Sequence, residues 1–516
     1  MGLLRDVATA NVLGMSHGGV MDAFVIAFRI PNLFRRLFGE GALAVSYLPV
    51  LTTLLERDRR AAWQLASVTL TLLAVILAVI VVVAEAICGL LWLRSGGTPP
   101  AATLLGLTAV MLPYLLFICL AAQVAATLQS LNHFSTPALA PTLLNVCWLA
   151  GAVLIAPRMT SNQVVQAYVI AVCVLVAGVL QLAVQLPVLW RLGFRFDYDW
   201  AAARPSIVAM LHTMTPMILG LAVTQVNTLM DSLIAWALSA PAGSSGIAWL
   251  GGSIAYPMRP GAAASIYYGE RLYQFPLGIL GLAVATAIYP LLSRHAARGD
   301  FRQLGADLTL GLRLVVFFGL PAGMGLVMLA GPLARLFFQH GQFTADDAAR
   351  TARMIAGYSC GVWAYCAIPV VVRGYYALGD RRTPVRVGAM TVVLNLTMNL
   401  LLVWPLAEAG LATATSIAAS VQVLVLVLIF SRRNSGLDWR ALGATSLRAL
   451  VATLVLALTG YATLAGIPAA SGMSQKLLQV LLPLGTGGLA FFAVYGLIGR
   501  HELGRMLARR GEESGE

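Results

Sequence analysis

Apolar stretches long enough to cross a membrane follow one another along almost the whole of this 516-residue chain. Because a helix rises 1.5 Å per residue, about 20 apolar residues span the roughly 30 Å of hydrocarbon in a bilayer. Only 11% of the residues are charged, and the mean hydropathy is +0.83. Soluble domains carry about 25% charged residues. The sequence therefore predicts an all-α polytopic membrane protein and excludes a soluble enzyme held by a single anchor.

Fourteen membrane helices are expected from the lengths of these apolar stretches. The first is short and looks like the second half of a span, so helix 1 is expected to be truncated. The predicted ranges are 3–17, 20–54, 62–93, 101–128, 136–157, 163–190, 206–238, 262–292, 306–330, 346–378, 384–404, 409–430, 444–465 and 475–499.

Arginines cluster in every second loop. Loops on the cytoplasmic side of a membrane carry an excess of positive charge, and an even number of helices returns the chain to the side from which it started. Both termini are therefore expected in the cytoplasm. The odd loops carry mainly isolated arginines, namely Arg94, Arg158 and Arg259. The even loops and the tail carry Arg57, Arg59, Arg60, Arg191, Arg195, Arg204, Arg294, Arg298, Arg302, Arg381, Arg382, Arg432, Arg433, Arg440, Arg500, Arg505, Arg509 and Arg510.

Three prolines recur in the same order in the two halves of the chain. The pairs are offset by 245, 241 and 247 residues and are Pro31 with Pro276, Pro49 with Pro290, and Pro137 with Pro384. This regularity predicts a duplicated six-helix unit whose copies keep one orientation, as in other parallel-repeat transporters. The expected parts are an N-terminal lobe at 1–192, a C-terminal lobe at 205–432, two extra helices at 444–500 and a cytoplasmic tail at 501–516.

Charged residues inside the predicted spans are the candidate functional residues. An arginine at mid-membrane costs roughly 2.5–3.5 kcal/mol and is tolerated only against protein or water. One interpretation is a set of ion pairs that fix helices together. The arginines outnumber the nearby carboxylates, however, and a cationic cleft would suit a phosphate, which the planar guanidinium group binds through paired hydrogen bonds. The residues are Arg5, Asp6, Asp22, Arg29, Arg35, Arg36, Glu40, Glu270 and Arg271.

Helix geometry leaves open which arginines of helix 2 face such a cleft. Asp22, Arg29 and Arg36 are spaced by seven residues and share one face of a straight helix. A kink at Pro31 would instead turn Arg35 towards that side. We prefer Arg35, and keep Arg29 and Arg36 as candidate neighbours.

Two further carboxylates have alternative interpretations. Asp231 lies in an otherwise apolar span, where it is either a hydrogen-bond acceptor between helices or a proton or sodium site. Asp380, near Arg373 at the end of helix 10, either caps a cytoplasmic turn or takes part in function.

Enzyme chemistry is not indicated by any motif. The six cysteines lack metal-ligand spacing, and Lys476 is the single lysine, which excludes a Walker-type ATP site. We expect no enzyme activity, no cofactor, no metal beyond sodium, and no nucleic-acid partner. Transport would then draw on an ion gradient, the membrane potential or a partner protein.

Several long motifs resemble the MurJ (MviN) family of lipid II flippases, within the multidrug/oligosaccharidyl-lipid/polysaccharide exporter superfamily. They are "MDAFVIAFRIPNLFRRLFGEGALAVSYLPVL" (21–51), "LNHFSTPALAPTLLNV" (131–146), "YYGERLYQFPLGILGLAVATAIYPLLS" (267–293), "LFFQHGQFTADDAARTA" (336–352) and "YYALGDRRTP" (375–384). The resemblance implies two six-helix lobes around a cavity, and a groove of helices 13 and 14 for the undecaprenyl tail. It also implies alternating access that carries lipid II to the outer leaflet for cell-wall synthesis.

The same resemblance assigns residues. It implies that Arg5, Asp22, Arg35, Glu40 and Arg271 serve the cationic cavity and its gate. It further implies a sodium site, for which Asp231 and Asp380 are the matching residues. Lipid II and membrane lipids are the expected partners, the protein is expected to be a monomer, and its place is the bacterial inner membrane.

Two departures from the family are visible. Family members have additional chain before the position of Arg5, with another cavity arginine, and we favour a start codon placed too far downstream over a shortened helix 1. The loop between helices 7 and 8, near residues 239–265, is an outward-facing insertion rich in Gly, Ser and Pro. The alternatives in function are export of another polyprenyl-linked oligosaccharide or of a drug, and a polytopic glycosyltransferase acting on lipid-linked sugars.

Overall fold

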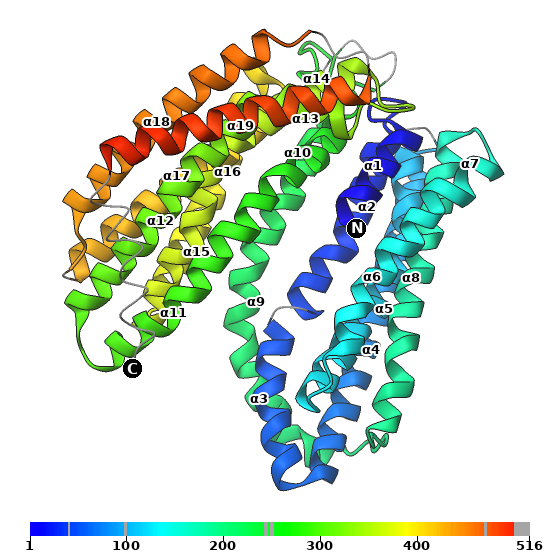
Figure 1. Ribbon diagram of the computed structural model, residues 1–516. Helices are drawn as coiled ribbons and strands as arrows, with labels where there is room; N and C mark the ends of the chain where they lie inside the picture. The colour runs from blue at the N-terminus through cyan, green and yellow to red at the C-terminus, as the bar shows by residue number, and fades with distance from the viewer. Residues whose placement is uncertain are drawn as a thin grey trace. The chain divides into compact units, whose positions relative to one another are not determined.

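The computed structural model describes residues 1–39, 42–97, 101–241, 246–247, 252–434, 436–468 and 472–499. Within these ranges the chain is helical throughout, apart from turns and one isolated bridge between Ser239 and Met258. The predicted all-α class is confirmed (Figure 1). Glu40, the arginines from Arg500 onward and parts of the helix 7–8 loop lie outside the described residues.

Most predicted ranges end within a few residues of the observed helices, because apolar length determines where a membrane helix begins and ends. The ranges 20–54, 136–157, 262–292 and 346–378 are each divided into two helices, and α13 was not predicted. Eleven helices among the described residues are long and apolar enough to cross a membrane. The predicted total of fourteen is consistent with this number but is not tested by it. In chain order the helices are α1 (Gly2–Leu13), α2 (Val20–Phe34), α3 (Ala42–Arg57), α4 (Arg59–Arg94), α5 (Ala101–Ser130), α6 (Ser135–Ala150), α7 (Ala156–Met159), α8 (Gln163–Arg191), α9 (Trp200–Ala237), α10 (Ala262–Pro276), α11 (Leu282–Ala297), α12 (Phe301–Met328), α13 (Ala330–Phe337), α14 (Ala345–Ser359), α15 (Val362–Ala377), α16 (Arg382–Leu406), α17 (Glu408–Arg433), α18 (Trp439–Ala465) and α19 (Met473–Ile498).

Short π-helical segments follow two of the prolines that the sequence pairs. Pro31 precedes η1 (Arg35–Gly39), and Pro276 precedes η4 (Leu277–Gly281). A proline removes one backbone hydrogen bond and clashes with the preceding turn, so the helix is rewound close to it. One of the three proline pairs, Pro31 with Pro276, thus has similar local consequences in both halves.

The first compact unit comprises Met1–Ala264 with His340–Asp347. In it α5 packs on α2, α4 and α8, while α9 packs on α2, α3 and α4. The unit boundary at Ala264 lies beyond α9, one helix later than the expected boundary at 192–205. The contacts of α9 explain this difference, because they join that helix to the first unit.

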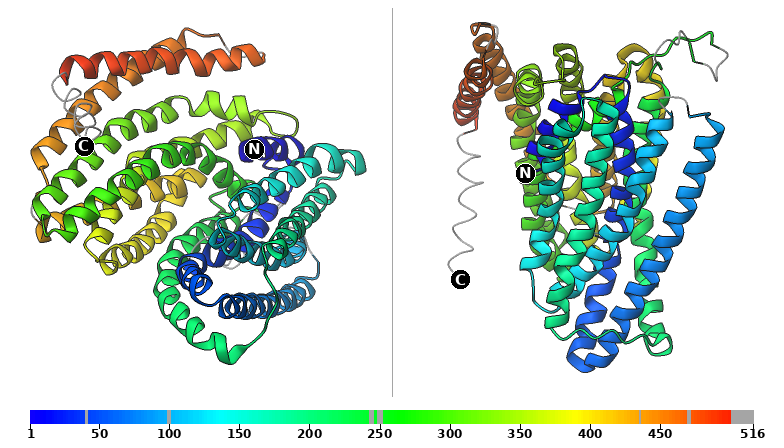
Figure 2. Two further views of the ribbon diagram at one scale, coloured as in Figure 1. Left: turned by 60° about the horizontal axis from the view of Figure 1, so that its bottom comes forward. Right: turned by 90° about the vertical axis from the view of Figure 1, so that its right-hand side faces the viewer.

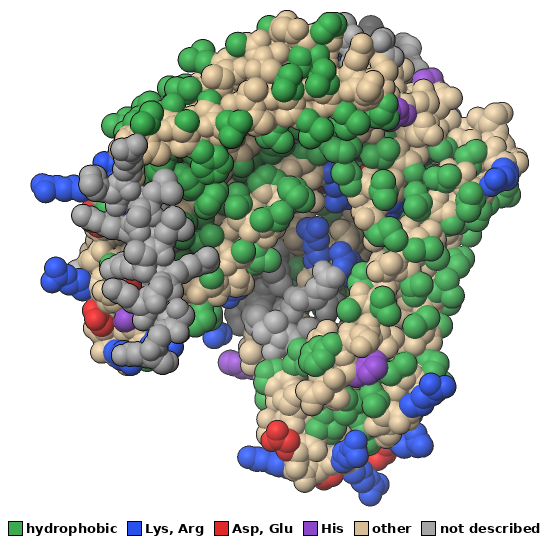
Figure 3. Space-filling view, in the orientation of Figure 1, with side chains coloured by type: hydrophobic (Ala, Val, Ile, Leu, Met, Phe, Trp, Pro, Cys, Tyr) green, Lys and Arg blue, Asp and Glu red, His purple; other side chains and the backbone are tan. Residues whose placement is uncertain are grey.

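The second compact unit comprises Ser265–Gln339 and the described residues from Ala348 onward. Its main core lies between α11, α12, α15 and α17. A smaller apolar cluster joins α12 to α18 and α19, which run side by side in Figure 2. In Figure 3 hydrophobic side chains cover much of the visible surface, and many of the charged side chains lie at its margins, as expected for a chain in a bilayer.

Candidate functional site

Arg5 lies buried in the first unit within a polar cluster. Its Nε and Nη2 atoms donate to one carboxylate oxygen of Asp6 at 2.9 and 2.8 Å, and its Nη1 donates to Asn145 Oδ1 at 3.3 Å. The guanidinium carbon lies 4.2 Å from the ring centre of Trp148. The indole N–H of Trp148 donates in turn to Thr9 Oγ1 at 2.9 Å. Helices α1 and α6 therefore hold this arginine in a defined orientation inside the bundle.

Arg35 begins the π-helical segment η1, where its Nε donates to Asn32 Oδ1 at 3.0 Å. Segment η1 packs on α5. The Trp148 ring that Arg5 contacts packs on Phe28, and Phe28 stacks on Tyr114 of α5. Tyr114 and Cys119 are buried on α5. The surroundings of Arg5 and of Arg35 are thus both linked to α5, although 30 residues separate the two arginines in the chain.

The other two arginines of helix 2 are directed towards α9. Buried Arg29 donates to the backbone oxygen of Thr228 at 2.8 Å. Exposed Arg36 donates to Gln225 Oε1 at 3.4 Å. The spacing of seven grouped Arg29 with Arg36, and both of these side chains contact α9, whereas Arg35 bonds Asn32 one turn earlier. Helix phasing alone did not predict this difference.

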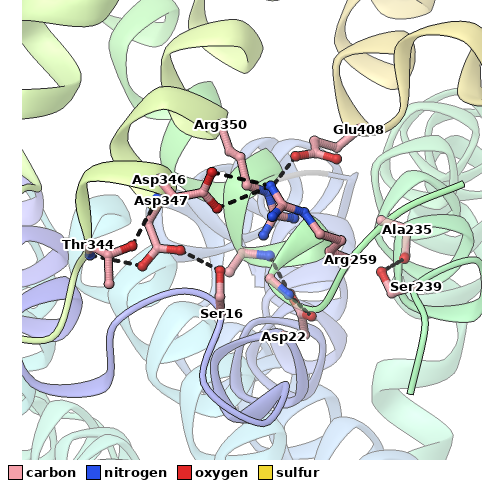
Figure 4. Close-up of polar contacts among 12 residues, drawn as sticks. Ser16, Asp22, Ala235, Ser239, Arg259, Thr344, Asp346, Asp347, Arg350 and Glu408 are labelled. Atoms are coloured by element: carbon pink, nitrogen blue, oxygen red, sulfur yellow. Dashed lines mark hydrogen bonds and ion pairs between the residues drawn. The ribbon is translucent and has the colours of Figure 1, made fainter. Parts of the chain in front are cut away.

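Asp22 caps a helix that begins 240 residues later (Figure 4). Its two carboxylate oxygens accept hydrogen bonds from Gly261 N at 2.6 Å and Ala264 N at 2.8 Å, in the first turn of α10. Gly261 has φ +92°, and a Cβ there would lie 2.9 Å from the backbone oxygen of Met15. Only glycine fits this approach without strain. The buried carboxylate of Asp22 is thus structural at this point.

Replacing Asp22 with alanine is expected to lower the free energy of unfolding by about 2–3 kcal/mol, since two buried N–H groups lose their acceptor. Thermal unfolding of the purified protein in detergent measures this loss. Asp58→Ala is the matched control, because Asp58 caps α4 in the same way from an exposed position. An equal or smaller shift for Asp22→Ala than for the control would contradict the assignment.

A second group of polar contacts at this end of the first unit was not predicted from the sequence. Ser16 donates a hydrogen bond to Asp347, and Thr344 and Asp347 bond each other's backbone N–H at 3.0 and 3.1 Å. Arg259 forms an exposed ion pair with Asp346 at 3.1 Å. Thr344, Asp346 and Asp347 belong to the sequence motif at 336–352. Nothing in their spacing indicated that they would bond Ser16, which follows α1, or Arg259, which lies in the helix 7–8 loop.

The second unit contains Arg271 and a buried ion pair. Arg271 on α10 stacks 4.4 Å from the ring centre of Tyr267 and donates to Gln274 Oε1 at 3.3 Å. Separately, Arg350 Nε lies 2.6 Å from Glu408 Oε1, with side chains only 1% and 7% exposed. The sequence analysis did not single out Arg350 or Glu408, because each is close to the end of an apolar segment and resembles a loop charge.

The two candidate ion ligands differ in their surroundings. Asp231 is buried on α9. Asp380 lies in the turn before α16 and accepts from the N–H groups of Arg382 and Thr383 and from the Thr383 hydroxyl. Burial opposes ionisation of Asp380, but these hydrogen bonds and Arg433 outweigh it, so the pKa of this carboxyl lies below its usual value. This is the capping geometry that the sequence left as an alternative.

No three His, Cys, Asp or Glu side chains within the described ranges are grouped so that they could hold a metal ion. A sodium site would therefore have to combine a single carboxylate with neutral oxygens. Asp231 is the buried one of the two candidate carboxylates, and the oxygens of Asp380 accept hydrogen bonds from backbone N–H groups.

Comparison with known proteins gives consistent results. Residues 9–479 match the family described as "Lipid II flippase MurJ". A probable lipid II flippase MurJ of Vibrio cholerae is 34% identical over 443 residues, covering 83% of this chain and 79% of the relative. The lipid II flippase MurJ of Burkholderia cenocepacia is 32% identical over 448 residues, covering 84% and 81%.

The fold is also similar to solved structures. A lipid II flippase MurJ in an inward closed conformation superposes with a TM-score of 0.75 at 23% identity, and 97% of each chain is covered. An inward-facing multidrug transporter of the MATE family gives a TM-score of 0.65 at 13% identity, covering 84% of this chain and 94% of that one.

Proposed function

The chain belongs to the lipid II flippase MurJ family, and on this basis we propose that it moves lipid II from the cytoplasmic to the outer leaflet of the inner membrane for cell-wall synthesis. Membership makes the chain a multi-pass membrane transporter and not an enzyme. The observation that carries the proposal for this chain is the placement of Arg5 and Arg35 in the first unit, where buried Arg5 lies against Trp148 and Arg35 begins η1, which packs on α5.

The diphosphate of lipid II is the part of the substrate whose transfer into a membrane costs the most free energy. A bare anion in hydrocarbon loses its hydration, so fixed guanidinium groups must replace the water. In this proposal Arg5 and Arg35 bind the diphosphate. Arg5 exchanges its hydrogen bonds with Asp6 for bonds to phosphate, so the carboxylate holds the guanidinium in place between transport cycles.

Energy for the movement is proposed to come from the membrane potential or from sodium. The potential supplies about 2.3 kcal/mol per charge per 100 mV. Asp231 is the proposed ion-binding carboxylate, and its burial in an apolar helix is what supports the assignment. We further propose that both termini are cytoplasmic and that the protein works as a monomer by alternating access.

Export of another polyprenyl-linked sugar, drug export and glycosyl transfer gain no support from a specific residue. The likeness to the MATE transporter reports the fold alone. A drug exporter for cations would need acidic groups where Arg5 and Arg35 lie, and a glycosyltransferase would need catalytic groups that no motif in the chain supplies.

Complementation tests the proposed function. In a strain depleted of its own lipid II flippase, this chain is expected to restore growth and normal cell shape. A form extended from an upstream start codon is expressed in parallel to test the role of the N-terminus. Lysis of the depleted cells despite correct insertion of both forms in the membrane would refute the proposal.

A further inference from the structure

Two helices of the second unit begin with the same kind of three-residue segment. Asp300-Phe301-Arg302 opens α12, and Asp438-Trp439-Arg440 opens α18. Each aspartate caps its helix, since Asp300 accepts from Gln303 N at 3.0 Å and Asp438 accepts from Ala441 N at 2.9 Å. Phe301 and Trp439 are 44% and 48% exposed. Aromatic residues at helix ends are typical of the membrane–water interface.

These two segments meet at one pocket of about 620 Å³, which Arg302, Arg440 and Trp439 line. The loop before α18 is held against α12, because Asp438 N donates to Thr309 Oγ1 at 3.1 Å. Gly436 allows this approach: its φ is +107°, and a Cβ there would collide with the backbone oxygen of Arg302. The hydrogen bond and the close backbone approach therefore fix the position of the two segments that line the pocket.

The lining holds two arginines and two aspartates, Asp300 and Asp438, and the two kinds of group differ in their partners. The carboxylates of Asp300 and Asp438 are bonded to backbone N–H groups at helix N-termini, where the helix dipole also balances them. Neither Arg302 nor Arg440 uses its guanidinium group in an ion pair or hydrogen bond with another residue in the described part of the chain. Two such guanidinium groups at one cavity suit a phosphate group, which each can bind through two hydrogen bonds.

An apolar stripe continues from the pocket along α18. Leu447, Leu454 and Leu458 follow Arg440 on the same helix face and are 63%, 50% and 71% exposed. From Arg440 to Leu458 the helix rises about 27 Å, at 1.5 Å per residue. This length accommodates a fatty acyl chain lying against the helix, with its headgroup at the pocket.

We propose that the pocket between the starts of α12 and α18 binds an anionic diacyl phospholipid of the surrounding membrane. Arg302 and Arg440 hold its phosphate, Trp439 lies at the interface, and the acyl chains lie along α18. Basic pockets between membrane helices are the expected sites for such headgroups. This site does not depend on the flippase proposal, and the basic loops around it assign it to the cytoplasmic leaflet.

Lipid binding to the purified full chain in detergent tests this site. The protein is titrated with dioleoyl phosphatidylglycerol, with dioleoyl phosphatidylcholine and with inorganic phosphate, and bound lipid is counted by native mass spectrometry. The test variant is Arg302→Gln with Arg440→Gln. The control is Arg204→Gln, which removes an exposed arginine near the start of α9, after Asp199-Trp200. All three substitutions are at exposed positions and are expected to leave folding intact.

The wild-type protein is expected to retain phosphatidylglycerol in preference to phosphatidylcholine. The double variant should bind phosphatidylglycerol about tenfold more weakly or worse, because it loses charge-assisted hydrogen bonds to phosphate, while Arg204→Gln behaves as wild type. Equal binding of phosphatidylglycerol by the double variant and wild type would overturn the site. Displacement of the lipid by inorganic phosphate at equal concentration would show a free-anion site and would overturn the lipid assignment.

Discussion

Arg35→Ala is expected to abolish support of growth in flippase-depleted cells while the protein stays in the membrane at its normal level. Removing one member of a desolvated charge interaction costs about 2–5 kcal/mol, which corresponds to a loss of roughly one and a half to three and a half orders of magnitude in transport rate. Arg271→Ala is expected to fail in the same way if its role in the second unit is the one implied by the family. Growth curves and membrane immunoblots measure the two quantities.

Arg158→Ala is the matched control for this experiment. Arg158 is exposed on α7, and its Nη1 bonds only the backbone oxygen of Leu154 one turn earlier, at 2.7 Å. The control should grow normally. Arg35→Lys should retain part of the activity, because the charge remains while the paired hydrogen bonds are lost. Normal growth with Arg35→Ala would remove Arg35 from the substrate site.

Arg350→Met is expected to produce the largest loss of stability. Removing one partner of a buried ion pair leaves the other charge without compensation and costs about 3–5 kcal/mol. The expected results are poor accumulation in the membrane and a strongly lowered midpoint of thermal unfolding in detergent. The double variant Arg350→Met/Glu408→Leu should recover most of the loss, since an apolar pair of similar volume needs no compensation.

Arg259→Met provides the comparison with an exposed pair. Arg259 and Asp346 lie 3.1 Å apart, but their side chains are 62% and 57% exposed, and such pairs contribute about 0–1 kcal/mol. The unfolding midpoint should therefore change little. If Arg350→Met were no more harmful than Arg259→Met, or if the double variant were worse than the single one, the interpretation of the Arg350–Glu408 pair would be wrong.

The helices could be predicted from the sequence because their lengths follow from the thickness of the bilayer. The predicted helix at 101–128 corresponds to α5 at Ala101–Ser130, and the one predicted at 163–190 corresponds to α8 at Gln163–Arg191. The paired prolines Pro31 and Pro276 also marked real interruptions of the helices. These features depend on local composition, which a single sequence contains.

The contacts of the charged residues could be predicted only in part. Arg5, Asp22 and Arg35 could be singled out because they lie in apolar spans of the sequence, where a charge is energetically costly. Their partners were not predictable: Asp22 bonds Gly261 across 239 residues, and Arg350 bonds Glu408 across 58. Such pairings depend on how the helices pack against one another. The spacing of residues along one helix does not indicate which helices will lie next to it.

The central claim is that this chain carries lipid II across the membrane, and the leaflet distribution of lipid II tests it most directly. In flippase-depleted cells, the fraction of lipid II accessible at the outer surface is measured with the wild-type chain, with Arg35→Ala and with an empty vector. The account predicts that wild type restores outer-leaflet lipid II to the level of undepleted cells, while Arg35→Ala stays at the level of the vector. Lipid II retained in the inner leaflet, with the wild-type chain present in the membrane, would contradict the account.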